Sequence, residues 1–169
     1  MADDTALTAM FEYYARGGER SRLDEPDGQL EFARTTQIIA RHLPAAPATV
    51  ADIGGGPGRY ARWLAGLGYR VLHRDLMPLH VEQLRAEAAG NPQIDSAVAD
   101  ARDPGLEPGS ADAVLLLGPL YHLERRADRL GALAAYFLEP ESDDGFLDWN
   151  FFDTALAVGR PYPVARWVR

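Results

Sequence analysis

Hydrophobic and polar positions along the chain follow two periodicities. Four short apolar runs, rich in branched and aromatic side chains, predict strands at residues 49–53, 69–74, 94–99 and 113–117. Apolar residues at three- and four-residue spacing predict the helices that follow, at residues 59–66, 78–89 and 124–137. Strands that alternate with helices imply parallel pairing. We therefore expect an α/β fold with a doubly wound, mostly parallel sheet and helices on both faces.

Two further helices are predicted before the first strand. The first covers residues 1–15, and its apolar face consists of Leu7, Met10, Phe11 and Tyr14. The second covers residues 30–43 and ends before Pro44, which cannot continue a helix. The charged segment between them, residues 17–28, is predicted to be irregular.

The tail after residue 137 lacks this alternation. It begins with an acidic loop, continues with an aromatic-rich stretch, and shows no strong fifth strand. The apolar strand at 113–117 would then lie at an exposed edge of the sheet, where it would invite association. Three alternatives would cover it: the tail itself, a partner chain or second copy, or residues that this sequence omits.

Composition limits the class of protein. The 169 residues are 47% hydrophobic, which fits one globular domain, and no apolar run approaches the length of a membrane helix. The acidic N-terminus is unlike a signal peptide, so we expect a cytoplasmic protein. Without cysteine there are no disulfides, thiolate nucleophiles or cysteine zinc sites, and we expect no metal.

The basic residues are all arginine. All 17 are Arg, and the net charge is −8. The bias itself is typical of a GC-rich genome. Without lysine the chain cannot form a Walker-type phosphate loop or a Schiff base. The acidic balance argues against a nucleic-acid substrate, because phosphate contacts dominate that affinity.

The most informative motif is the turn after the first predicted strand, whose sequence is Asp52-Ile53-Gly54-Gly55-Gly56-Pro57-Gly58. A dinucleotide fingerprint would need its third glycine at position 59, which is Arg59. The observed pattern, acid-x-Gly-x-Gly-x-Gly, resembles the first motif of class I S-adenosylmethionine (SAM)-dependent methyltransferases. The alternative is a structural turn without a ligand.

Two further acids follow the next strands. Asp75 ends the second predicted strand, where a carboxylate accepts hydrogen bonds from ribose hydroxyls in doubly wound folds. Asp100 ends the third. The alternatives are an N-cap for the helix at Pro78 and a turn acid that caps Arg102.

The resemblance implies a Rossmann-like domain with SAM as cofactor. Its methionine side would lie on Asp52, Gly54, Gly56 and Gly58, its ribose on Asp75, and its adenine beside Asp100, Ala101 and Arg102. The segment Leu117-Gly118-Pro119-Leu120-Tyr121-His122-Leu123 is also similar to a subgroup of these enzymes and would flank the methyl group.

Tyr121 and His122 are the candidates for catalysis. His122 is either a general base or a structural histidine. Tyr14, with residues 20–24, resembles the lid of the same subgroup, although Tyr14 could instead pack in the core. The resemblance implies that Tyr14 and Leu117 also contact the cofactor.

These observations predict three regions: a helical lid (1–48), a SAM-binding core (49–137) and an atypical tail (138–169). We expect in-line methyl transfer to a small-molecule acceptor. The alternatives are a non-catalytic SAM-binding or partner subunit and, in another class, a short dehydrogenase. The dehydrogenase is disfavoured by the glycine spacing and by the absence of lysine for a Tyr-x-x-x-Lys pair.

Overall fold

The computed structural model describes residues 2–137 and 164–166, with side-chain environments for residues 7–133. Its centre is a sheet in the order β3-β2-β1-β4-β5. The strands are β1 (Thr49–Ile53), β2 (Arg70–Asp75), β3 (Ile94–Val98), β4 (Ala113–Leu116) and β5 (Val164–Arg166). The first four pair in parallel, as the sequence predicts, and each begins and ends within one residue of its predicted bounds.

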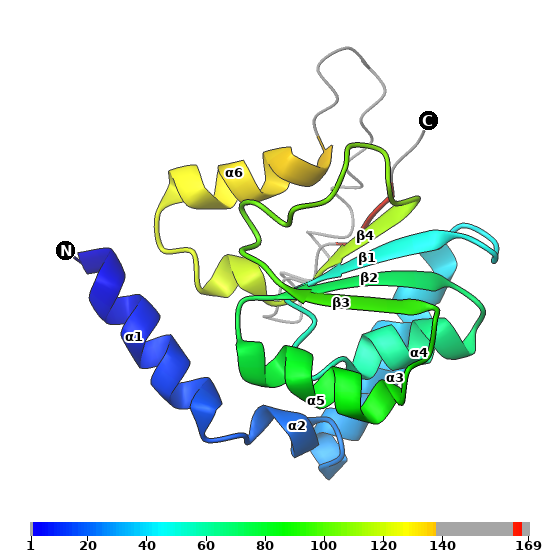
Figure 1. Cartoon of the computed structure of the whole chain (residues 1–169), viewed down its shortest axis with the longest axis horizontal. Coiled ribbons are helices and arrows are strands. Elements are labelled where there is room, and N and C mark those ends of the chain that lie inside the picture. Colours follow the sequence, from blue (N-terminus) through cyan, green and yellow to red (C-terminus); the bar gives the residue numbers. More distant parts are fainter. Residues whose placement is uncertain (1, 138–163, 167–169) are drawn as a thin grey trace.

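The helices cover both faces of this sheet (Figure 1). They are α1 (Ala2–Ala15), α2 (Glu19–Arg22), α3 (Pro26–His42), α4 (Arg59–Gly66), α5 (Pro78–Ala88) and α6 (Arg126–Phe137), with a 3-10 turn, η1 (Pro119–Tyr121). Figure 1 shows α3, α4 and α5 below the sheet and α6 above it. The doubly wound α/β fold is therefore confirmed.

Alternating side chains of the strands supply two separate cores. Val50 and Leu115 pack with residues of α3, α4 and α5, whereas Ile53 and Leu116 pack on the other face, where Leu133 of α6 lies against them. Strands buried on both faces must be apolar at nearly every position. This requirement explains the unbroken hydrophobic runs in the sequence.

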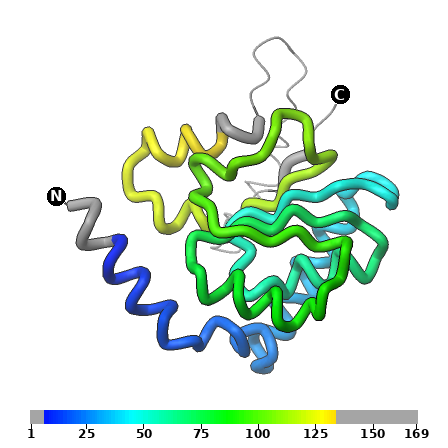
Figure 2. Tube along the Cα trace, viewed as in Figure 1, coloured from blue at the N-terminus to red at the C-terminus, as the bar shows by residue number. Residues whose placement is uncertain are grey.

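The N-terminal region differs from its prediction. The segment predicted to be irregular contains α2, and α3 begins at Pro26, four residues before the predicted start at residue 30. Pro26 occupies the first turn of α3, where a missing N–H costs nothing. Figure 2 shows α1 and α2 as an arm that runs past one end of the sheet.

The free side of β4 is paired. The three residues of β5 lie antiparallel to it, although no strong fifth strand was expected from the pattern of the tail. Part of the tail therefore covers this edge, which is the first of the three alternatives. The rest of the predicted tail region lies outside the described residues. Among the helices that the structure describes, none has the length and hydrophobicity needed to cross a membrane.

Candidate functional site

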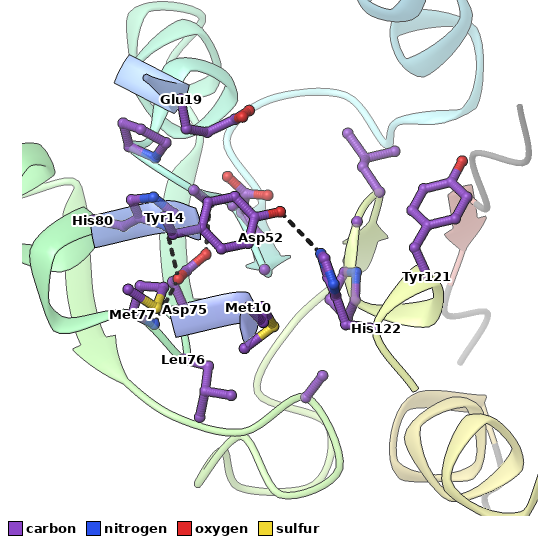
Figure 3. Close-up of a pocket in the computed structure, with 18 of the residues that line it drawn as sticks. Met10, Tyr14, Glu19, Asp52, Asp75, Leu76, Met77, His80, Tyr121 and His122 are labelled. Carbon is purple, nitrogen blue, oxygen red and sulfur yellow. Dashed lines mark hydrogen bonds and ion pairs between the residues drawn. The ribbon is translucent and has the colours of Figure 1, made fainter. Parts of the chain in front are cut away.

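A cavity of about 620 Å³ lies at the carboxyl ends of β1, β2 and β4. In open α/β sheets this edge is where ligands bind. The glycine turn after β1 lines it, together with side chains of α1 and α2, among them Met10, Tyr14 and Glu19 (Figure 3). The N-terminal helices therefore contribute directly to the cavity.

The structure brings almost all of the predicted site residues together. The ones that line this cavity are Tyr14, Asp52, Gly54, Gly56, Asp75, Asp100, Ala101, Arg102, Leu117, Tyr121 and His122. Gly58 is not among the lining residues. Their positions fit one site, while their individual roles toward a ligand remain predictions.

The glycines of the turn have different surroundings. Gly56 has a φ of 57°, and a Cβ added there would meet only the Cγ atom of Glu19, at 3.9 Å. Gly58 has a φ of 81°, and a Cβ there would collide with the buried side chain of Leu84. Gly56 thus leaves open space on the cavity side, whereas Gly58 allows α4 and α5 to pack closely.

Asp75 is held by three protein donors. Its Oδ2 accepts a hydrogen bond from the N–H of Gly56 (2.8 Å), and its Oδ1 accepts from the N–H of Met77 (2.8 Å) and from Nδ1 of His80 (3.0 Å). Burial alone would raise the pKa of Asp75, but His80 and the two N–H groups hold it below its ordinary value. The carboxyl is therefore ionised, and it is fixed against the glycine turn.

His73 holds the same turn from the other side. Its Nε2 donates to the carbonyl oxygen of Gly56 (3.0 Å), while its Nδ1 bonds the hydroxyl of Ser96 (2.9 Å). Burial lowers the pKa of His73, so the ring is neutral. Both backbone groups of Gly56 thus have buried side-chain partners, which makes the turn rigid at its most open residue.

Asp52 is the second buried carboxyl of the cavity. Its side chain is 1% exposed, and its Oδ2 has no hydrogen-bond partner among the described residues. Burial, followed by the nearby charge of Asp75, raises the pKa of Asp52 to about 7. The site therefore contains one firmly ionised carboxyl and one that takes up a proton near neutral pH.

Asp100 lies beyond the end of β3 and binds Arg102. Its carboxylate accepts bonds from the backbone N–H (2.8 Å), the Nε (2.9 Å) and an Nη (2.6 Å) of Arg102. The hydrogen bonds from Arg102 lower the pKa of Asp100. Asp100 therefore caps Arg102, as one of the two alternatives from the sequence has it. It also lines the cavity.

Tyr14 and His122 meet across the cavity. The Tyr14 hydroxyl lies 2.9 Å from Nε2 of His122, as Figure 3 shows. Burial raises the pKa of Tyr14 to about 12 and lowers that of His122. A protonated phenol therefore faces a neutral imidazole and can donate to Nε2. Tyr14 lies at the cavity instead of in the core.

Replacing Tyr14 tests whether burial by this side chain lowers the pKa of His122. We expect Tyr14→Ala to expose the imidazole and to raise the pKa of His122 toward the ordinary value of about 6.5. Titration of the imidazole ¹⁵N resonances by NMR measures it. Tyr13→Ala removes the neighbouring, 59% exposed ring as a control. An unchanged pKa in Tyr14→Ala would contradict burial by the N-terminal helix.

Two ion pairs that share Glu87 connect α2 with α4 and α5. Glu87 of α5 binds Nε of Arg20 in α2 and an Nη of Arg62 in α4, each at 2.9 Å. We call these contacts the Glu87 bridge. A second pair, Arg59 with Asp24, lies at 2.9 Å on the same side. The segment after α1 is thus attached at two places.

Glu87→Gln should loosen this attachment. Because Arg20 is largely exposed, we expect the free energy of unfolding to fall by only about 0.5–1 kcal/mol. Trypsin should nevertheless cleave after Arg20 and Arg22 several times faster than in the unchanged protein. Glu82→Gln, at an exposed position of the same helix, is the matched control. Equal cleavage rates in both variants would show that the bridge does not hold α2.

Sequence reasoning missed His73 and His80. Each lies where a hydrophobic residue would be expected, within β2 and on the first turn of α5, and both are buried. A titratable residue inside an apolar pattern was the available signal. Within the described part of the chain, no group of His, Asp and Glu side chains could hold a metal ion.

Comparison with known proteins identifies the family. A family model described as a methyltransferase domain matches residues 51–137, just over half of the chain. Among solved structures, phosphoethanolamine N-methyltransferase 1 of Haemonchus contortus, with phosphoethanolamine and S-adenosylhomocysteine, is 25% identical with a TM-score of 0.55. That alignment covers 66% of this chain and 24% of that one. No curated protein matches the chain by sequence.

Two other solved structures agree in fold. Phosphoethanolamine N-methyltransferase 2 of H. contortus, with S-adenosyl-L-methionine, is 24% identical (TM-score 0.53, 60% of this chain and 24% of that chain). A SAM-dependent methyltransferase of Methanosarcina mazei is 20% identical (TM-score 0.52, 57% and 48%). This chain spans less than half the length of each. The resemblance to SAM-dependent methyltransferases seen in the sequence is confirmed, and so is SAM as the cofactor of this family. The chain belongs to the methyltransferase domain family.

Proposed function

We propose that the protein is a SAM-dependent methyltransferase that acts on a small-molecule acceptor. The observation that carries this proposal is the arrangement of Asp75 and Gly56. A firmly ionised carboxylate is bonded to the N–H of the most open glycine, at the carboxyl edge of the sheet. A carboxylate at this position can accept hydrogen bonds from ribose hydroxyls, and the backbone beside it can be approached closely.

The residues of the cavity fit SAM. Gly56 leaves room for close approach, and Asp52 offers a buried oxygen without a partner to a positively charged group. Asp52, Gly54 and Gly56 would hold the methionine side, Asp75 the ribose, and Asp100 with Ala101 and Arg102 the adenine. Gly58 would act indirectly, through the packing of α4 on α5. When bound, SAM supplies an activated methyl group on a positively charged sulfur.

On the acceptor side, Tyr14, Tyr121 and His122 surround the cavity together with Leu117. We assign His122 as the general base for acceptors that lose a proton. Its Nε2 takes that proton directly or through the Tyr14 hydroxyl, and the lowered pKa keeps the nitrogen available at neutral pH. Tyr121 is 53% exposed and would contact the acceptor.

The N-terminal region, residues 1–48, serves as a lid over the core of residues 49–137. Tyr14 and the Glu87 bridge hold it across the cavity. A closed lid excludes water and orients the reactants, and such positioning contributes up to roughly 7–11 kcal/mol in well-oriented reactions. The cavity of about 620 Å³ would hold the cofactor together with a small acceptor.

The test is transfer of tritium from methyl-labelled SAM to a panel of small phenols, carboxylates and amines. Transfer that His122→Asn reduces by about a hundredfold or more for phenols, which must lose a proton, and much less for carboxylates, which are already ionised, would support the proposal. Binding of S-adenosylhomocysteine without transfer to any acceptor would favour the non-catalytic alternative instead. A cytoplasmic location, the lack of a nucleic-acid partner and the oligomeric state stay predictions from the sequence.

A further inference from the structure

The helix α1 lines the cavity with uncharged side chains. Leu7, Met10 and Tyr14 all line it, and their spacing of three and four residues places them on one face of the helix. We call these three side chains the uncharged wall. Figure 3 shows Met10 and Tyr14 of this wall with His122 and Tyr121 across from them. The space beside His122 is therefore bounded by apolar and aromatic groups, which suit an uncharged ligand with a flat ring.

The charged side chains of the cavity are already matched with one another. Within the described part of the chain, every arginine that lines the cavity makes an ion pair, as Arg22 does with Glu19 (2.6 Å) and Arg102 with Asp100 (2.6 Å). Carboxyl groups also outnumber arginines among these lining residues. An anionic acceptor would have to break an existing pair, and burying an unpaired charge is costly. We therefore expect an acceptor without a negative charge.

The contact between Tyr14 and His122 indicates which kind of hydroxyl group fits this space. The phenolic hydroxyl of Tyr14 lies 2.9 Å from Nε2 of His122. Its ring packs edge to face against the rings of His122 and His80, with centroids 5.6 and 5.2 Å apart. Aromatic rings prefer this arrangement. The site thus already holds one phenol, with its hydroxyl directed at the imidazole and its ring among other rings.

The chemistry of His122 favours the same class of acceptor. A neutral imidazole is a weak base, so it can take a proton only from a hydroxyl group that ionises readily. A phenol has a pKa of about 10, whereas that of water is about 15.7 and an aliphatic alcohol resembles water in this respect. A hydroxyl group on an aromatic ring therefore matches this base, and one on a saturated ring does not.

We infer that the acceptor is a neutral aromatic alcohol, whose ring lies against the uncharged wall and whose hydroxyl donates to Nε2 of His122, directly or through the Tyr14 hydroxyl. The inference rests on the proposed function and names its substrate class. The acceptor oxygen bonds to the methyl carbon as the electron pair of the carbon–sulfur bond goes to sulfur, and the hydroxyl proton passes to Nε2. From there the proton is released to water.

Calorimetry on the protein saturated with S-adenosylhomocysteine tests this inference with probes that share one ring system. 2-Naphthol is neutral and can donate, 2-methoxynaphthalene cannot donate, and 2-naphthoate and 2-naphthylmethylamine carry opposite charges. We expect 2-naphthol to bind about tenfold more tightly than 2-methoxynaphthalene, the value of one hydrogen bond, and at least about tenfold more tightly than either charged probe. With labelled SAM, 2-naphthol should accept methyl groups at least about a hundredfold faster than its saturated analogue, decahydro-2-naphthol.

A variant of the uncharged wall should change this preference. Leu7→Arg places a cation in the wall at a position that is 41% exposed, where the fold tolerates it. We expect the affinity for 2-naphthoate to rise by about tenfold, and that for 2-naphthol not to rise. Ala9→Arg, at an exposed position of the same helix outside the cavity lining, is the matched control and should leave both affinities unchanged. Equal effects of the two variants would contradict the place of the wall.

The possible failures separate this inference from the proposed function. If S-adenosylhomocysteine binds but 2-naphthol does not, or if a charged probe or 2-methoxynaphthalene binds as tightly as 2-naphthol, the inference is wrong and the proposed function stands. Equal transfer to decahydro-2-naphthol would also overturn the inference. If S-adenosylhomocysteine does not bind the protein, the proposed function fails and the inference fails with it.

Discussion

Asp75→Asn will weaken the binding of S-adenosylhomocysteine by about ten- to a hundredfold, the value of a hydrogen bond to a charged group. The same change will lower the free energy of unfolding by about 1–3 kcal/mol. Both effects arise because Asp75 accepts from Gly56 at one oxygen and from Met77 and His80 at the other. Whichever way the Asn amide lies, its NH₂ group faces an N–H donor.

The pH dependence of this loss follows from the lowered pKa of Asp75. A depressed native pKa stabilises the fold above the unfolded value of about 3.9. The difference in stability between the unchanged protein and Asp75→Asn should thus be full at pH 7 and should shrink as the pH falls through the native pKa. Asp103→Asn, an exposed acid that also accepts a backbone N–H, is the control. Equal stabilities at pH 7 would contradict the account.

Gly56→Ala will mainly weaken ligand binding, whereas Gly58→Ala will mainly destabilise the fold. Both positions have positive φ, which costs an alanine about 1–2 kcal/mol. At Gly58 the new methyl group also collides with Leu84, which adds roughly 1–3 kcal/mol of overpacking. Gly58→Ala should therefore mainly destabilise the fold, by about 2–5 kcal/mol in all.

Gly56→Ala places its methyl group in the open space of the cavity, so the larger loss should be in ligand binding. We expect S-adenosylhomocysteine to bind about tenfold or more weakly, from roughly 1–3 kcal/mol of crowding. Urea unfolding and calorimetry on both variants separate the two effects. If Gly58→Ala were as stable as Gly56→Ala, the division of roles within the turn would be wrong.

The sheet could be predicted from sequence because burial on both faces leaves a strong local pattern. Residues 49–53 and 59–66 have the bounds of β1 and α4, since an apolar run and a glycine turn mark them. The short elements were missed because distant contacts stabilise them. Arg22 in α2 binds Glu31 of α3, and β5 has only three residues and pairs with β4 far away in the sequence.

The location of the candidate site was predictable from position along the chain. The place of Asp75 at the end of a strand, and the spacing of Gly54 and Gly56, put them at the edge where the cavity lies. Position could not reveal what surrounds each residue. Gly58 packs against Leu84, Asp100 is engaged by Arg102, and His80 bonds the carboxylate that spacing had identified. These partners come from different elements, so only the folded structure brings them together.

Calorimetric titration with S-adenosylhomocysteine tests the central claim most directly, that this cavity is a SAM site built on Asp75 and Gly56. We predict saturable one-to-one binding to the unchanged protein, at least about tenfold weaker binding to Asp75→Asn, and no binding of NAD. Absence of binding up to about 1 mM S-adenosylhomocysteine, or equal affinity for Asp75→Asn, would contradict the account.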